Sequence, residues 1–383
     1  MRTSRLPWPG ANVAFVALAG IVLCACGSSS TSAGRSPVAS SSATPSASSS
    51  PTRAATPTPP PVPTPAIVGS FGVLVTPPSA ATYTVSLIGI GGRVVASAQA
   101  SSPATVSCSG TAAAVLPMPV STSNSRVYFM DAGGAVRTLS PDGTVSPGPV
   151  ITLPTGSARR STFAVSPDDS QMAVVVSDFT TGGASTALYV DTLPGGATQN
   201  AIFTQTGSFI LWPTGWHGIN NLVVAKVPAC TQGGGPLCCG PQELHVVDPA
   251  TATRRFTLGG PQCVVAGFAT PAGVVCESTT FTAANVLTWT ALTLRSIPIQ
   301  GPTPGYLSPD GTLVALTDFG TGTTIVNGAN RTMALQACGW IDATHLLAGG
   351  DTQQQPRVGD TTTGTIVPVA AQGQCGGRLP GGL

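Results

Sequence analysis

Short runs of alternating apolar and polar residues, separated by turn residues, follow one another from Ile67 to the C-terminal end of the chain. Residues 83–96 show the unit: Tyr-Thr-Val-Ser-Leu-Ile, a Gly-rich turn, and then Arg-Val-Val-Ala. A period of two predicts a half-buried strand, and two such runs around a turn predict a β-hairpin. The pattern therefore predicts an all-β domain over residues 67–383. The same unit recurs in residues 127–139, 187–196, 244–256, 324–333 and 358–367.

The spacing of these hairpins predicts the architecture. Asp131, Asp191 and Asp248 follow corresponding runs at intervals of about 60 residues, and other hairpins recur at roughly 35 to 45 residues. In an all-β chain, such periods are typical of the blades of a β-propeller. We expect about seven blades, with six or eight left open, and a pair of β-sandwiches is the structural alternative. The expected blades start near residues 70, 112, 160, 208, 262, 302 and 338.

A second repeat places a proline turn before an apolar run. Residues 165–179 begin Val-Ser-Pro-Asp-Asp, and residues 307–319 begin Leu-Ser-Pro-Asp-Gly. Proline presets such a turn, and the aspartate side chain caps it. We expect the run after each turn to be an inner strand of a sheet. A third copy begins at Ser140, in a different loop.

A third repeat is a glycine followed by an aromatic residue shortly before an apolar run. Gly215-Trp216 and Gly339-Trp340 are the clear copies, and Gly267-Phe268 is a degenerate one. An aromatic residue at one fixed point of each blade is expected to pack between adjacent blades, rather than to serve as a platform for an aromatic ligand.

Together these segments resemble the Pro-Asp type β-propellers related to the Tol-system periplasmic propeller, and more loosely the tryptophan-aspartate repeat family. The resemblance covers most of residues 67–383 and is specific at residues 165–179 and 307–319. It implies a β-propeller fold. The Gly-His and Trp-Asp dipeptides of the second family do not stand at repeating positions.

Composition agrees with this fold class. Charged residues are only 8% of the chain, with one lysine and two glutamates, whereas 46 glycines and 36 prolines suit short strands and tight turns. Amphipathic helices need far more Glu and Lys than this. The formal charge is +2, and the pairs Arg159–Arg160 and Arg254–Arg255 are isolated, so we expect solvated charges at loops or strand edges. Without a basic stripe, no nucleic-acid partner is predicted.

The N-terminal residues predict export and a lipid anchor. Arg2 and Arg5 precede an apolar stretch that ends Leu23-Cys24-Ala25-Cys26, which resembles the bacterial lipobox. This stretch is short for a membrane span. We therefore predict a signal peptide over residues 1–25, and lipid attachment at Cys26. An ordinary cleaved signal with a chance cysteine is the alternative. The predicted location is the outer, extracytoplasmic face of the cell membrane, with the membrane as one partner.

A linker separates this anchor from the domain. Residues 26–66 follow with little besides Ser, Thr, Pro and Ala, and they contain no aromatic residue. Such a segment cannot bury enough apolar surface to fold, and its proline-rich half favours an extended polyproline II conformation. We expect a disordered spacer that holds the domain away from the membrane.

The remaining cysteines predict disulfides, because an even number in an exported chain is typical of them. Cys263 and Cys276 flank a symmetric segment whose hairpin would place them opposite each other. Cys230 could pair with Cys238 or Cys239. Three of these cysteines cluster within residues 230–239, but that segment contains no His and the sequence has no Cys-x-x-Cys pair, so we predict no metal site. The candidate disulfide cysteines are Cys108, Cys230, Cys238, Cys239, Cys263, Cys276, Cys338 and Cys375.

No catalytic motif accompanies these features. The chain has no Gly-x-Ser-x-Gly, no His-Glu-x-x-His and no P-loop, so we predict no catalytic residues and no cofactor. We expect His217, His245 and His345 to be structural, and the aspartates to cap turns. The leading hypothesis is a surface-anchored, noncatalytic propeller that binds an envelope protein, peptide or glycan. The alternative is an envelope hydrolase or lyase built on a propeller. The aspartates concerned are Asp131, Asp142, Asp168, Asp191, Asp248, Asp310 and Asp360.

Overall fold

The computed structural model of the chain describes residues 69–77, 81–109, 112–180, 183–193, 201–231, 243–260, 263–265, 267–351 and 353–383. The predicted signal peptide and the whole predicted linker, with Cys26, lie outside these residues, as do Cys238 and Cys239. Regular structure in the described part is all β. No helix in this part is long and apolar enough to cross a membrane.

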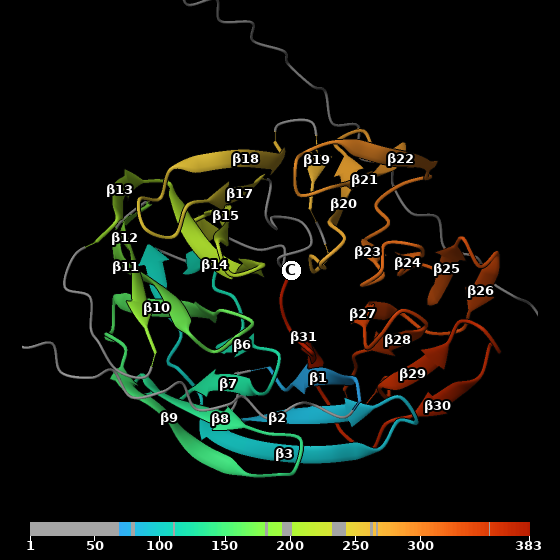
Figure 1. Cartoon of the computed structure of the whole chain (residues 1–383), viewed down its shortest axis with the longest axis horizontal. Helices are drawn as coiled ribbons and strands as arrows, with labels where there is room; N and C mark the ends of the chain where they lie inside the picture. Colours follow the sequence, from blue (N-terminus) through green and yellow to red (C-terminus); the bar gives the residue numbers. More distant parts are fainter. Residues whose placement is uncertain are drawn as a thin grey trace, which may run out of the picture. The chain divides into compact units, whose positions relative to one another are not determined.

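Within the described residues, the strands form seven antiparallel sheets of four strands each, arranged in a ring (Figure 1). This is a seven-bladed β-propeller, as the hairpin spacing predicted. We number the blades from the N-terminal one and give the strands of each from the innermost outward. Blade 1 contains β31 (Gln374–Leu379), β1 (Phe71–Val75), β2 (Thr82–Gly89) and β3 (Val94–Ser101); blade 2 contains β6 (Val120–Thr122), β7 (Val127–Met130), β8 (Ala135–Leu139) and β9 (Val145–Thr152); blade 3 contains β10 (Arg159–Val165), β11 (Gln171–Thr180), β12 (Gly183–Thr192) and β13 (Phe203–Gly207).

The other four blades repeat the arrangement. Blade 4 contains β14 (Phe209–His217), β15 (Asn221–Pro228), β17 (Glu243–Val247) and β18 (Arg254–Gly259); blade 5 contains β19 (Cys263–Val264), β20 (Val274–Ser278), β21 (Ala283–Leu287) and β22 (Thr293–Pro298); blade 6 contains β23 (Gly305–Leu307), β24 (Val314–Asp318), β25 (Thr323–Asn327) and β26 (Arg331–Met333); blade 7 contains β27 (Ala337–Trp340), β28 (His345–Ala348), β29 (Arg357–Asp360) and β30 (Ile366–Pro368).

Six of the seven predicted blade starts fall within a few residues of a blade's first strand in the sequence. The start predicted near residue 112 is wrong, because blade 2 begins at Val120. Residues near 112 belong instead to an eighth, three-stranded sheet formed by β4 (Ser107–Ser109), β5 (Ala112–Ala114) and β16 (Cys230–Thr231). A local run of small apolar residues does not reveal whether its strand partners lie in the next hairpin or in a distant loop.

The two ends of the domain close the ring. The C-terminal strand β31 pairs antiparallel with β1 and becomes the innermost strand of blade 1. Open strand edges need to be covered, and pairing of the two chain ends achieves this. Blade 7 is completed by its own four strands, so the N-terminal strand does not join the last blade, and it is blade 1 that takes a strand from the other end of the chain.

The aspartate turns are as predicted, with one difference. Asp168 accepts hydrogen bonds from the hydroxyl of Ser166 and from the backbone and side chain of Ser170. Asp310 does the same with Ser308 and the backbone N–H of Thr312. The difference concerns the strand that follows. Each turn joins the innermost strand of its blade to the second strand, so the run after the turn is the second strand and not the innermost one. The copy at Ser140 lies between the two outer strands of blade 2.

Buried aromatic residues tie neighbouring blades together. The indole N–H of Trp216 donates to the carbonyl of Ala164 in blade 3, and that of Trp340 donates to the carbonyl of Tyr306 in blade 6. Both indoles are buried, which confirms the packing role. Phe268 does not share this role, because it is half exposed. The degenerate copy keeps the glycine but its aromatic side chain does not pack between blades.

Three pairs of cysteines form disulfides, which supports the prediction of disulfides for six of the eight candidates. Cys263 and Cys276 pair as expected, although Cys263 faces Ser278 in the register and meets Cys276 diagonally. Cys230 pairs with Cys108, 122 residues away, so pairing with Cys238 or Cys239 is wrong. Cys338 of blade 7 pairs with Cys375 of β31 and fastens the closing strand.

Candidate ligand-binding site

An insertion between blades 1 and 2 crosses to blade 4. Residues 102–119 contain β4 and β5, and β5 pairs with β16 in the connection between β15 and β17. The disulfide of Cys108 and Cys230 joins the two segments, with their Cα atoms 6.1 Å apart. The indole N–H of Trp212 donates to the carbonyl of Val115 at 3.1 Å. These contacts fasten the insertion to blade 4.

A cavity of about 200 Å³ lies between this insertion and the inner strand of blade 3. Its walls are formed by two stretches of the insertion, within residues 103–106 and 114–119, by Met130 at the end of β7, and by residues 160–163 of β10. Most of them are apolar, and three of the lining residues are prolines, which have no backbone N–H to offer a ligand. The lining residues are Pro103, Ala104, Thr105, Val106, Ala114, Leu116, Pro117, Met118, Pro119, Met130, Arg160, Ser161, Thr162 and Phe163.

Arg160 is the charged residue of this cavity, and it is 4% exposed. Its Nη2 donates to the carbonyl oxygen of Ala104, whereas its buried Nε has no hydrogen-bond partner. Burial lowers the pKa of the guanidinium, and no neighbouring charge opposes that effect. All 14 acidic residues of the chain lie in the described part, and none of the ion pairs there includes Arg160. Arg160 is therefore a buried cation without a counter-charge.

This corrects the expectation that the pair Arg159–Arg160 is solvated. Arg159 is exposed and pairs with Asp178 through two hydrogen bonds, one of them 2.9 Å long. Successive residues of a strand point to opposite faces, so its neighbour Arg160 turns toward the cavity that the insertion covers. The pair Arg254–Arg255 is exposed as predicted, and Arg255 bonds Asp248.

Two further polar atoms near the cavity lack partners. The hydroxyl of Thr162, two residues after Arg160 on β10, is buried without a hydrogen bond, and so is that of Ser102 beside Pro103. In the described part, these two atoms, Nε of Arg160 and Oε1 of Glu277 are the buried side-chain atoms without partners. Two of the four thus belong to residues that line the cavity, and the third, Ser102, is the chain neighbour of the lining Pro103, although buried polar groups are nearly always paired in proteins.

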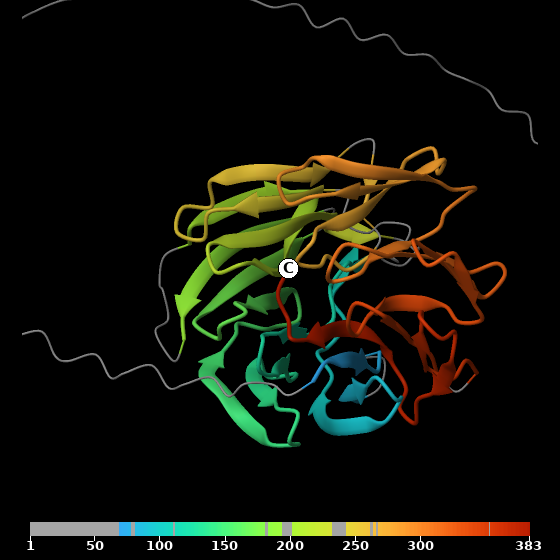
Figure 2. The same ribbon diagram turned by 45° about the vertical axis from the view of Figure 1, so that its right-hand side comes forward.

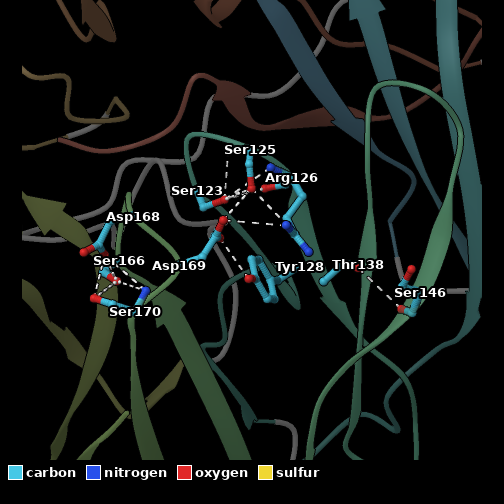
Figure 3. A network of polar contacts seen from close by, with 10 residues as sticks. All are labelled: Ser123, Ser125, Arg126, Tyr128, Thr138, Ser146, Ser166, Asp168, Asp169 and Ser170. Atoms are coloured by element: carbon cyan, nitrogen blue, oxygen red, sulfur yellow. Dashed lines mark hydrogen bonds and ion pairs between the residues drawn. The ribbon is translucent and has the colours of Figure 1, made fainter. Parts of the chain in front are cut away.

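A polar network occupies the opposite end of β10, between blades 2 and 3 (Figure 3). Asp169, in the Ser-Pro-Asp turn, accepts hydrogen bonds from the hydroxyls of Ser125 and Tyr128. The guanidinium of Arg126 lies 3.7 Å from the same carboxylate. Burial, and then the negative charge of Asp169, raise the pKa of Tyr128. Because the partners satisfy one another across the blade boundary, this network stabilises the contact between the two blades.

The C-terminal residues lie along that same end. The backbone N–H of Gly381 donates to Ser123 of blade 2, and that of Leu383 donates to Trp216 of blade 4. Figures 1 and 2 both place this end of the chain at the centre of the ring. His217 bonds the carbonyl of Leu383 at 2.7 Å and stacks on Trp289. The histidine thus fixes the tail.

The other residues singled out from the sequence have structural partners. His245 bonds Glu243 at 2.8 Å, and His345 bonds Asp342 at 2.9 Å. Burial lowers the pKa of His245, which opposes the effect of the neighbouring glutamate. Backbone N–H groups in the same turn donate to six of the seven aspartates; Asp191, the seventh, is buried. The six are Asp131, Asp142, Asp168, Asp248, Asp310 and Asp360.

Comparison with known proteins adds no family. The sequence matches no protein-family model and no curated protein. Similar solved structures include a chain of the mitotic checkpoint complex, with 12% identity, a TM-score of 0.43, and coverage of 73% of this chain and 84% of that one. The propeller domain of Cps50 (Swd1) from Myceliophteria thermophila gives 11% identity, a TM-score of 0.41, and coverage of 75% and 95%. The dihydro-heme d1 dehydrogenase NirN gives 12% identity, a TM-score of 0.42, and coverage of 81% of this chain and 75% of that one.

Proposed function

We propose that this protein is a lipid-anchored, noncatalytic binding propeller on the outer face of the cell membrane. Its ligand is a protein, peptide or glycan of the cell envelope, and part of that ligand enters the cavity beside Arg160. The sequence Leu23-Cys24-Ala25-Cys26 supports the anchor, and the Ser/Thr/Pro-rich linker supports a domain held clear of the membrane. Three disulfides are typical of an oxidising compartment outside the cytoplasm.

One observation carries the binding role: a cavity whose buried cation has no counter-charge. Burying such a charge without a partner costs free energy of desolvation, and a ligand that pairs with the charge offsets that cost. The histidines and turn aspartates bond to neighbouring groups in the fold, so they are engaged in holding it. A rigid ring that presents a small, preformed cavity is suited to binding.

Binding to isolated cell envelopes tests this proposal. Full-length protein, purified in detergent and labelled with a fluorophore, is mixed with envelopes that lack it and then sedimented. Thr105→Trp places a large side chain at an exposed position of the cavity wall. Thr332→Trp is the matched control, on an exposed position of the outermost strand of blade 6.

We expect saturable binding by the unmodified protein and by Thr332→Trp, and an affinity at least 10-fold lower for Thr105→Trp, since about 1.4 kcal/mol corresponds to each factor of ten. Equal binding by both variants would exclude the cavity as the site. Absence of saturable binding by the unmodified protein would refute the binding role itself.

A further inference from the structure

The chemistry around Arg160 narrows what the cavity accepts. The exposed arginines Arg159 and Arg255 have aspartate partners, at Asp178 and Asp248, whereas buried Arg160 has none. This distribution of ion pairs is unusual. An exposed ion pair contributes little to stability, whereas a buried charge is strongly destabilising without a partner. The missing partner is therefore a group that the chain itself does not supply.

We propose that the ligand inserts a carboxylate into this cavity and that Arg160 supplies its counter-charge. This inference rests on the binding function proposed above and names the chemical class that the site recognises. A guanidinium presents five N–H donors in a planar fork that matches the two oxygens of a carboxylate. One donor atom of Arg160, Nη2, is occupied by Ala104, and its Nε is uncommitted.

The walls select for a carboxylate on a short apolar stem. Val106, Leu116, Met118, Met130 and Phe163 offer hydrocarbon surface but no strong donor. In such surroundings an ion pair is screened far less than in water, so a charged group is distinguished from its neutral isostere.

Size adds a second restriction. A volume of about 200 Å³ equals the liquid volume of roughly seven waters, at about 30 Å³ each. It therefore admits a side chain or a chain end, rather than a whole oligosaccharide or peptide. The unpartnered hydroxyl of Thr162, on the same face of β10 as Arg160, is a further donor for the second carboxylate oxygen.

Methionine methyl groups provide a readout that does not depend on the arginine. Met118 and Met130 line the cavity, whereas Met333 packs in a separate core cluster and serves as the internal reference. The full-length protein is labelled with methyl-¹³C methionine and titrated with sodium propionate. Propionamide, which has the same shape without the charge, and sodium chloride at equal ionic strength are the two controls.

We expect propionate to shift the Met118 and Met130 signals with a dissociation constant on the order of 1 mM, as suits so small a ligand. Propionamide and chloride should bind at least 10-fold more weakly. Arg160→Gln should abolish the propionate shifts, Thr162→Val should weaken them several-fold, and Arg159→Gln should leave them unchanged. The Met333 signal shows whether each variant is folded, and Thr162→Val keeps the test open if Arg160→Gln does not fold.

A second pair of titrations separates the two sources of such a carboxylate. N-acetyl-alanyl-alanine is compared with its C-terminal amide, and glucuronate is compared with glucose. Tighter binding of either acid than of its neutral partner supports the inference and identifies a peptide end or a uronate as the source.

Equal shifts with propionate and propionamide, or with propionate and chloride, would overturn the carboxylate inference. They would leave the envelope-binding proposal standing if Thr105→Trp still weakens binding to envelopes. If propionate shows no preference and Thr105→Trp also binds envelopes as tightly as Thr332→Trp, both proposals are overturned.

Discussion

Leu74→Ala tests whether the pairing of the two chain ends stabilises the whole ring. Leu74 lies on β1, between β2 and the closing strand β31, and it is fully buried. It packs against Ile88 of its own blade and against Ile341 and Leu347 of blade 7. The side chain therefore lies at the point where the first and last blades meet.

The expected loss follows from this burial. The substitution removes three buried carbons at about 0.8 kcal/mol each and leaves a cavity, so the free energy of unfolding should fall by about 3 kcal/mol. With an unfolding entropy of about 2.1 cal/mol/K per residue, a domain of roughly 300 residues should melt about 5 °C lower. Leu294→Ala is the control, because the same substitution at a side chain that is 63% exposed should change the melting temperature by less than 1 °C.

Tryptophan fluorescence and circular dichroism, followed through the same melt, provide the assay. In the described part, the tryptophans Trp212, Trp216, Trp289 and Trp340 lie in blades 4, 5 and 7, and none lies in blade 1. If the closed ring unfolds as one unit, both signals should shift together by the same amount. Equal melting of the Leu74→Ala and Leu294→Ala variants would refute the closure argument, and a shift seen by only one probe would refute the single unit.

Three further predictions concern the disulfides, a buried acid and the anchor. Replacing Cys338 and Cys375 together by Ala should lower the free energy of unfolding by about 4 kcal/mol, since that bond closes a segment of 37 residues, and a denaturant titration without reductant measures the loss. Burial raises the pKa of Glu277, so its charged form costs stability as the pH rises through that pKa; Glu277→Gln should gain on the order of 1 kcal/mol at pH 7 and nothing at pH 4, a difference that melting at the two pH values would reveal. Cys26→Ala should release the protein from membranes and prevent incorporation of radiolabelled palmitate, and continued labelling of the variant would contradict lipid attachment there.

Much of the fold could be predicted because it depends on residues close together in the sequence. A hairpin such as residues 83–96 needs only alternating side chains and a turn, and the Asp168 and Asp310 turns are capped by groups within a few residues. Repetition of these local units at nearly regular spacing was then enough to predict the propeller and its number of blades.

The sequence by itself determined the fold class, the turns and the presence of paired cysteines, whereas the tertiary structure decided which distant segments meet. Cys108 finds Cys230 across 122 residues, and β31 joins β1 rather than the last blade, because closing a ring brings together residues whose separation no local pattern encodes. The candidate site has the same origin. Arg160 differs from Arg159 by one step along a strand, and only the insertion that covers β10 makes one a surface charge and the other a buried cation that lacks a partner.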